Sequence, residues 1–211
     1  MTAETRAHWE GVYSTRSADQ VSWHRPHLEV SFELLVRAGL NEQSRVIDIG
    51  GGASTLVDDL LDFGVRTVTV VDLSGASLAV ARQRLGERAT RVNRMAADVT
   101  TLDAPQGSFD LWHDRAALHF LVKPEAARAY VRAATQAIAP GGHAVVGCFA
   151  ADGPERCSGL PVVRRDPPEI AALFGVAFSL VESRREVHRT PSGGAQRFAY
   201  ALLRKAPQPG R

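Results

Sequence analysis

Three aspartates, each placed after an apolar run, are the residues whose types and spacing most directly indicate chemistry. Asp48 lies in Val46-Ile47-Asp48-Ile49, Asp72 follows 24 positions later, and Asp98 follows after another 26. If each run is a strand of one parallel sheet, the three carboxylates lie along the edge where open α/β folds bind ligands. Asp48 would face an amino group, Asp72 would accept from two ribose hydroxyls, and Asp98 would accept from an exocyclic adenine amine.

The glycine run Gly50-Gly51-Gly52 directly follows the first of these strands. Without Cβ atoms, the turn lets a ligand approach the backbone and the N–H groups of the next helix. A dinucleotide site would read G-x-G-x-x-G, but the third glycine position is Thr55, and Asp48 would face a pyrophosphate. A nicotinamide dehydrogenase is therefore disfavoured, and a ligand that carries an ammonium is favoured.

A second group of polar residues follows the apolar run Phe109–His113. The run continues into Asp114 and Arg115, and His119 comes one helical turn later. His119 is the candidate general base, with a structural place in a helix as the alternative. Arg115 would either attract an anionic group of a substrate or pair with a neighbouring acid.

Large aromatic side chains gather near the N-terminus, at Trp9, Tyr13 and Trp23. The surrounding sequence is too polar for a core helix, so these rings need another surface to cover. We expect this segment to pack as a lid on the main domain. Aromatic faces attract cations, so the lid would also wall a ligand site.

The elements that would position these groups alternate between strand and helix patterns. Strands are expected near residues 45–49, 67–71, 91–97, 109–113, 143–149, 177–187 and 196–204. Helices are expected near residues 26–39, 56–63, 75–85, 124–139 and 168–174, with a short helical stretch at 116–121. Residues 150–168 are rich in Pro, Gly and Arg, and they predict a functional loop.

Composition bounds the class of protein. The chain has 211 residues, of which 45% are hydrophobic and 23% are charged, as expected for one soluble globular domain. No apolar run reaches the roughly 20 residues of a membrane span, and the N-terminus shows no signal peptide, so we expect a cytoplasmic protein without a membrane partner. The net charge is +2, and the arginines are spread along the chain rather than gathered in one block, which gives no support for nucleic-acid binding.

The two cysteines, Cys148 and Cys157, are nine positions apart. This spacing matches neither a C-x-x-C motif nor a zinc site, so we expect no metal and no disulfide. Cys157 in the long loop is interpreted as a plain loop cysteine rather than as a reactive thiol.

With these motifs in place, the chain resembles the class I S-adenosylmethionine-dependent methyltransferases over nearly its whole length. Val46–Gly52 is similar to their glycine-rich motif, Val70–Ser74 to their ribose-binding motif, and Ala139–Gly142 to their turn before strand five; Ser54 stands where many members have a third glycine. The resemblance implies a Rossmann-like α/β fold, with a seven-stranded sheet of order 3-2-1-4-5-7-6, strand seven antiparallel and helices on both faces. Residues 1–40 would form the lid and its helix, 41–205 the methyltransferase domain, and 206–211 a frayed tail.

The resemblance also implies a cofactor, S-adenosylmethionine, which leaves as S-adenosylhomocysteine, and a set of site residues. The catalytic candidates are Asp114, Arg115 and His119. The cofactor-binding candidates are Trp9, Tyr13, Trp23, Asp48, Gly50, Gly51, Gly52, Asp72, Leu73, Asp98, Val99 and His113.

A narrower resemblance is to the thiopurine-methyltransferase-like branch, through Trp9-Glu10-Gly11-Val12-Tyr13 and Asp114-Arg115-Ala116-Ala117-Leu118. Related protein lysine methyltransferases share similar motifs. The resulting expectation is a monomer or weak homodimer that methylates a sulfur, nitrogen or oxygen atom of a small molecule. The alternatives are a protein lysine methyltransferase and a non-catalytic regulatory protein that binds S-adenosylmethionine.

Overall fold

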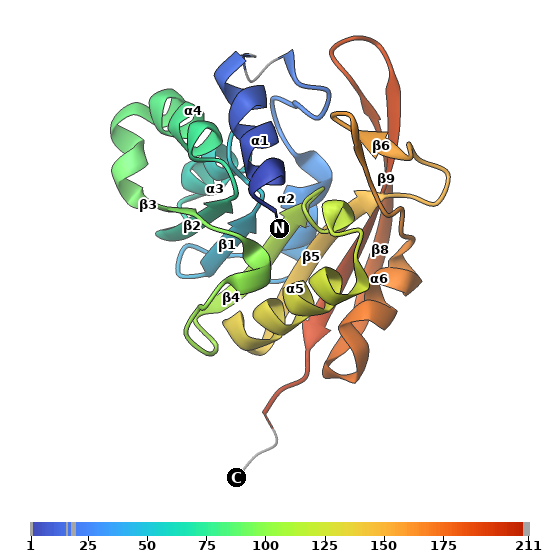
Figure 1. Cartoon of the computed structure of the whole chain (residues 1–211). Helices are drawn as coiled ribbons and strands as arrows, with labels where there is room; N and C mark the ends of the chain where they lie inside the picture. The colour runs from blue at the N-terminus through green and yellow to red at the C-terminus, as the bar shows by residue number, and fades with distance from the viewer. Residues whose placement is uncertain (1, 16, 18–19, 209–211) are drawn as a thin grey trace.

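The computed structural model describes residues 2–15, 17 and 20–208. In this part of the chain, seven strands form one sheet of order β3-β2-β1-β4-β5-β9-β8 (Figure 1). These strands are β1 (Arg45–Ile49), β2 (Thr67–Asp72), β3 (Val92–Ala96), β4 (Phe109–Arg115), β5 (Ile138–Phe149), β8 (Phe178–Arg189) and β9 (Ala195–Lys205).

The pairing directions confirm the predicted sheet. Strand β1 runs parallel to β2 and β4, and β5 runs parallel to β4. Strand β9 is antiparallel to both β5 and β8, so it is the antiparallel seventh strand of the expected order, and β8 is the sixth. The carboxyl ends of β1, β2, β3 and β4 therefore share one edge.

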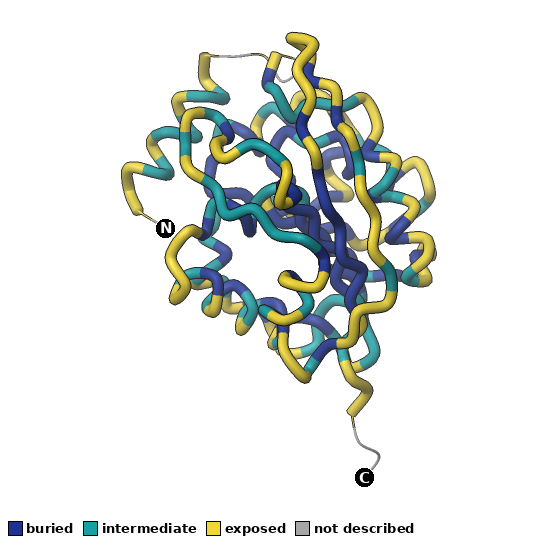
Figure 2. Tube along the Cα trace, turned by 90° about the vertical axis from the view of Figure 1, so that its right-hand side faces the viewer, coloured by how far each residue is buried: buried dark blue, intermediate teal, exposed yellow. Residues whose placement is uncertain are grey.

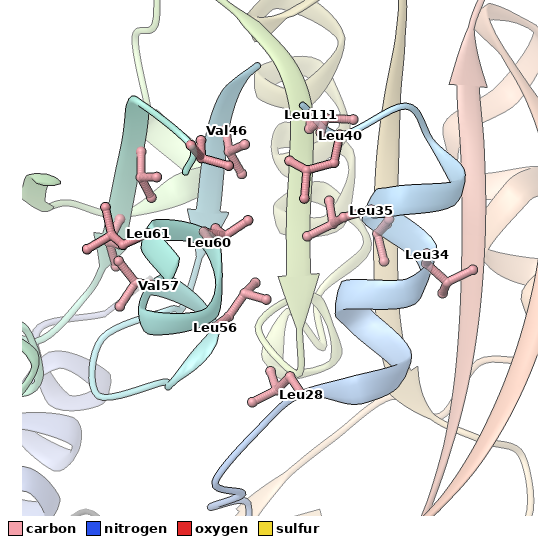
Figure 3. Close-up of a cluster of buried hydrophobic side chains, with 14 of the residues drawn as sticks. Leu28, Leu34, Leu35, Leu40, Val46, Leu56, Val57, Leu60, Leu61 and Leu111 are labelled. Carbon is pink, nitrogen blue, oxygen red and sulfur yellow. The ribbon is translucent and has the colours of Figure 1, made fainter. Parts of the chain in front are cut away.

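Helices cover both faces of the sheet. The α-helices of the described chain are α1 (Ala3–Thr15), α2 (Glu29–Arg37), α3 (Leu56–Phe63), α4 (Gly75–Leu85), α5 (Pro124–Ala137) and α6 (Pro167–Phe174). Short 3₁₀ turns span Gly86–Arg91, Val99–Thr101, Leu118–Phe120 and Gly175–Ala177. Buried apolar residues of α2 and α3 pack in one cluster (Figure 3), to which Leu78 and Leu85 of α4 also belong. Buried apolar residues of α5 and α6 pack in another cluster, which contains Trp112.

The core lies within the sheet, where Figure 2 shows long buried stretches in the middle of the molecule. Strands β1 and β5 are buried almost throughout their apolar runs because helices cover them on both sides. The edge strand β8 is mostly exposed or half-buried and is rich in Arg and Glu. Charges of this kind protect an open edge from pairing with other chains.

Several predicted boundaries were wrong in detail. Helix α2 begins at Glu29 rather than near Pro26, since the carbonyl of Arg25 accepts a hydrogen bond from the Thr55 hydroxyl and the chain enters the helix only afterwards. Strand β5 begins at Ile138, which pairs with Phe109 before the register shifts. The Pro140–Gly142 turn is thus an irregularity inside a longer strand rather than the break before it.

Two elements were not predicted at all. The long loop contains a small hairpin, β6 (Arg156–Cys157) and β7 (Leu160–Pro161), which forms a separate two-stranded sheet. Helix α1 was expected only as a lid of undefined structure. None of its residues is buried, and it packs against α4. A helix of this kind lacks the aliphatic stripe by which buried helices are recognised in a sequence, so it was not predicted.

At the C-terminus, the expected frayed tail lies partly on residues 209–211, which are outside the described chain. Residues 206–208 have no regular structure, although the Ala206 N–H donates to the Ala177 carbonyl at 2.9 Å. None of the described helices combines the length and the hydropathy of a membrane-spanning segment. Within the same residues no cluster of His, Cys, Asp and Glu is arranged to hold a metal ion.

Candidate active site

A cavity lies at the carboxyl ends of β1, β2 and β4, beneath α1. Its empty space, which includes open solvent at its mouth, is about 740 Å³. Its wall is largely apolar and aromatic. The predicted site residues that line it are Trp9, Tyr13, Trp23, Gly50, Asp72, Leu73, Val99 and Arg115. The cavity thus stands where an open α/β sheet is expected to bind its ligand.

The glycine turn is shaped by the neighbouring acids as much as by access for a ligand. A Cβ on Gly51 would lie 2.1 Å from Asp48 Oδ2, and one on Gly52 would lie 2.5 Å from Asp72 Oδ2. Gly50 has a φ of +69°, and of the three it is the one that lines the cavity. Gly51 and Gly52 are therefore needed because side chains pack against them, and Gly50 is needed because of its positive φ, reasons that the sequence alone did not reveal.

Asp48 lies under this turn and is paired with His113. The two residues are register partners in β1 and β4, and Asp48 Oδ1 lies 2.7 Å from His113 Nδ1. Both side chains are buried, and among the described residues neither Asp48 Oδ2 nor His113 Nε2 has a hydrogen-bond partner. A buried carboxylate oxygen without a donor is costly unless a ligand supplies one.

Asp72 ends β2 and faces the cavity. Its Oδ1 accepts a hydrogen bond of 2.8 Å from the Ser74 N–H. Burial raises the pKa of Asp72 to about 6, against the opposing effect of hydrogen-bond donors on Ser74, Ser77 and Gly52. Ser74 also caps α4 by accepting from the Ser77 N–H.

Asp98 and Val99 follow β3. Asp98 caps the 3₁₀ turn Val99–Thr101 and accepts from the Thr100 N–H at 2.9 Å and the Thr100 hydroxyl at 2.7 Å. Val99 lines the cavity and Asp98 does not. The acid is therefore one residue away from the wall, at the edge of the site.

Helix α1 closes the cavity with aromatic and polar contacts. The ring centroids of Trp9 lie 5.6 Å from Trp23 and 5.1 Å from Phe120, both edge to face. Glu10 accepts from the N–H groups of Gly75 at 2.7 Å and Ala76 at 3.0 Å, at the start of α4. These contacts hold α1 against the start of α4 and against Trp23 and Phe120.

A further polar contact comes from Arg6, whose Nη1 donates to the Leu73 carbonyl at 2.8 Å. Residues 6, 9, 10 and 13 recur at helical spacing, so one face of α1 meets the ends of β2 and α4 (Figure 1). Because this face is polar and aromatic, it holds the lid without making it part of the core.

Arg115 is paired with an acid, which was one of its two expected roles. Its Nε donates to the Tyr200 hydroxyl at 2.9 Å, its Nη1 donates to the Trp23 carbonyl at 3.2 Å, and its Nη2 lies 3.7 Å from Glu186 Oε2. The guanidinium also stacks over Phe198 at 4.2 Å from the ring centroid. Arg115 lines the cavity, where its Nη2 is buried without a hydrogen-bond partner.

Asp114 and His119 lie behind the cavity wall. Asp114 is fully buried and accepts from the N–H groups of Ala117 at 2.8 Å and Leu118 at 3.0 Å, so it fixes the turn after β4. Burial raises the pKa of Asp114 to about 6.

The surroundings of His119 do not suit the general base that was expected there. His119 is fully buried beside Phe120 and Phe149, with centroid distances of 4.4 and 4.7 Å, and neither ring nitrogen has a partner. Burial, with the nearby charges of Arg115 and Arg165, lowers the pKa of His119 to about 3. The spacing from Arg115 suggested one helical face, but the segment is a 3₁₀ turn, and His119 points into the apolar interior.

Other residues of the site were missed. Cys157, set aside as a loop cysteine, lines the cavity from β6, and burial raises the pKa of its thiol to about 12. Glu10, Glu186 and Tyr200 hold the surroundings of the cavity together, and Glu186 and Tyr200 lie far in sequence from the predicted motifs. Only the position of Glu10 one residue after Trp9, on a helix face, offered a signal.

Comparison with known proteins agrees with this geometry. Residues 46–142 match a family described as a methyltransferase domain. The structure of the Burkholderia thailandensis 1,6-didemethyltoxoflavin-N1-methyltransferase, with its substrate and S-adenosylhomocysteine bound, is 26% identical, covers 96% of this chain and 84% of that chain, and superposes with a TM-score of 0.69.

Two curated relatives match shorter regions. An eEF1A lysine and N-terminal methyltransferase from Mus musculus is 25% identical over 118 residues, which are 56% of this chain. A ubiquinone/menaquinone biosynthesis C-methyltransferase from Methylobacterium nodulans is 38% identical over 71 residues, or 32% of this chain. The matched regions span only 17% and 28% of the lengths of these two relatives.

Proposed function

Because this chain belongs to the class I S-adenosylmethionine-dependent methyltransferases, we propose that it transfers a methyl group to a small molecule bound in the cavity beneath α1. The observation that carries the proposal is the largely apolar cavity that α1 covers with Trp9 and Tyr13. Concave sites with apolar and aromatic walls and a few polar groups are typical of small-molecule binding.

The residues of the site fit the cofactor. The unpartnered Oδ2 of Asp48 offers an acceptor to the ammonium of an amino acid, and the Asp72 carboxylate in the cavity wall offers one to ribose hydroxyls. We assign Leu73, Val99 and the glycine turn to the walls around the nucleoside, and the lid to the covering of the site. S-Adenosylmethionine, when bound there, supplies a methyl group on a sulfonium sulfur that departs as a neutral thioether.

The protein's own contribution is to orient the reactants and exclude water. Methyl transfer is an in-line displacement, and holding the reacting atoms in a row lowers the barrier by several kcal/mol. We assign Asp114 to positioning, since it fixes the turn Ala116–Leu118 that forms part of the wall. Arg115 contributes a buried cation that is largely neutralised by Glu186.

A second candidate function is methylation of a protein. The similarity to the eEF1A lysine and N-terminal methyltransferase favours it. The deciding experiment is release of S-adenosylhomocysteine with a panel of thiols, amines and phenols, run beside a panel of purified proteins. Turnover with at least one small molecule supports the main proposal. Turnover only with proteins would contradict it, and binding of the cofactor without any turnover would point to a regulatory protein.

A further inference from the structure

The acceptor itself can be narrowed by asking which groups in the cavity could remove a proton. This inference rests on the proposed function. Among the described residues that line the cavity, the titratable side chains are Tyr13, Asp72, Arg115 and Cys157. A general base must reach the acceptor atom directly or through one water, so each of these four has to be considered in turn.

Three of them are poor bases in this site. The Arg115 guanidinium is a donor only and stays protonated. The Cys157 thiol is 5% exposed, and burial raises its pKa to about 12. Burial likewise raises the pKa of the Tyr13 hydroxyl well above its ordinary value. A thiol and a phenol in these surroundings hold their protons at neutral pH.

Asp72 is the fourth, and its carboxylate is already occupied. Oδ1 accepts from the Ser74 N–H at 2.8 Å, and Oδ2 is packed against Gly52, where a Cβ would approach to 2.5 Å. The same carboxylate is the group assigned above to the cofactor ribose. A side chain that holds the cofactor at the end of β2 is not free to receive the acceptor's proton.

The groups just outside the wall do not replace these. His119 points into the apolar interior, and His113 is hydrogen-bonded to Asp48. Asp114 is occupied by two backbone N–H groups. His8 lies 3.3 Å from the Ser158 hydroxyl, outside the residues that line the cavity.

We propose that the acceptor is a small molecule whose reacting atom needs no deprotonation by the protein: a thiol that ionises in solution, or a ring nitrogen with a free lone pair, rather than an alcohol or phenol. The acceptor's lone pair forms the new bond to the methyl carbon while the old carbon–sulfur bond breaks and its electron pair stays on the sulfur. A thiol loses its proton to solvent before it binds. A ring nitrogen keeps the positive charge or releases an N–H proton to solvent afterwards.

The test uses the full-length protein and acceptors matched in shape. One aromatic ring is presented with a thiol or with a hydroxyl at the same position, together with a ring of similar size that has an unprotonated nitrogen. Release of S-adenosylhomocysteine is measured from pH 6 to pH 9 at saturating S-adenosylmethionine. At pH 7 we expect kcat/KM for the hydroxyl compound to be at least about 100-fold lower than for the thiol, the lower end of what a general base contributes.

The pH profile separates the acceptor's ionisation from that of an enzyme group. With two thiols of different acidity, the midpoint of kcat/KM should move with the pKa of each thiol. With the ring nitrogen, the profile should be flat wherever its lone pair is free. In Cys157→Ser and Tyr13→Phe, these midpoints should stay where they are, whatever happens to the absolute rates.

The inference is overturned if the hydroxyl compound is methylated about as fast as the thiol. It is also overturned if the pH profile of kcat/KM has the same midpoint with every acceptor and this midpoint disappears in Cys157→Ser, Tyr13→Phe or His119→Gln. In that case the proposed function stands and a base is present. If no small molecule is methylated and a purified protein is, the small-molecule function fails and this inference fails with it.

Discussion

Asp48 and His113 are register partners on neighbouring parallel strands, and their side chains are joined at 2.7 Å between Oδ1 and Nδ1. Among the described residues, the other oxygen of Asp48 and the other nitrogen of His113 have no hydrogen-bond partner. His113 thus holds Oδ1 of Asp48, and Oδ2 lies against Gly51 in the glycine turn. Under the proposed function, this second oxygen is the acceptor for the ammonium of the cofactor.

The first prediction concerns this free oxygen. Asp48→Asn should weaken binding of S-adenosylhomocysteine by about 1.5–3 kcal/mol, the contribution of a hydrogen bond to a charged group. Titration calorimetry measures the change, and NAD should not bind to either protein. Asp110→Asn is the matched control, because Asp110 lies on the neighbouring strand β4 but pairs with Arg45 away from the cavity. NAD binding more tightly than S-adenosylmethionine would contradict the assignment.

The second prediction is a pH dependence of cofactor binding. Burial raises the pKa of Asp72 to about 6 in the ligand-free protein, and ribose hydroxyls donate to its ionised form. The dissociation constant of S-adenosylhomocysteine should therefore be constant above pH 6 and rise about tenfold for each pH unit below it. Asp72→Ala should weaken binding by about 2–3 kcal/mol at pH 7 and abolish this dependence. An unchanged affinity in a folded variant would make Asp72 only a helix-capping acid.

The same pKa has a consequence for stability without ligand. A carboxyl whose folded pKa is raised stabilises the fold most below its unfolded pKa, near 3.9, and this contribution is lost as the pH rises through 6. Asp72 thus costs the ligand-free protein stability at neutral pH. Adding S-adenosylhomocysteine should raise the melting temperature more at pH 7 than at pH 5.

The sheet could be predicted from the sequence because its information is local. The strands that end at Ile49, Asp72 and Arg115 are apolar runs bounded by turns. The order of the strands in the sheet was predicted from the resemblance of their motifs to those of the methyltransferases. The lid's helix, in contrast, has no aliphatic stripe, and its partners Leu73 and Gly75 lie some 65 residues away. Periodicity carries no signal for contacts of this kind.

Of the three aspartates predicted at strand ends, Asp72 lines the cavity, Asp98 lies one residue outside its wall and Asp48 lies beneath the glycine turn. Asp72 and Arg115 reach the cavity, whereas His119 does not. The direction of a side chain after a strand depends on the number of residues per helical turn. This number is smaller in a 3₁₀ turn than in an α-helix, and His119 lies in a 3₁₀ turn. Cys157 was missed because the hairpin that carries it is only two residues per strand.

The third prediction concerns the lid. Hydrogen exchange in residues 5–15 and 20–25 should slow when S-adenosylhomocysteine binds, because the rings of α1 cover the cavity that it fills. Glu10→Ala removes the acceptor for two N–H groups of α4 and should speed exchange in α1 in the ligand-free protein. Glu4→Ala on the same helix is the control and should change little. Exchange that is the same with and without ligand would mean that α1 is a fixed part of the fold.

The last prediction separates the two roles of Arg115. Arg115→Ala removes the hydrogen bonds to Tyr200 and to the Trp23 carbonyl, and it should lower the free energy of unfolding by roughly 1–3 kcal/mol, as measured by denaturant titration. If the acceptor carries an anionic group that pairs with the Arg115 guanidinium, kcat/KM for it should also fall about ten- to a hundredfold, while the affinity for S-adenosylhomocysteine stays nearly constant. Glu186→Gln is the matched variant: it disturbs the same network but leaves the cation less neutralised, so an anionic acceptor should bind at least as well as before. A parallel loss of cofactor affinity and acceptor efficiency in Arg115→Ala would instead show that Arg115 holds the cavity wall together and does not recognise the acceptor.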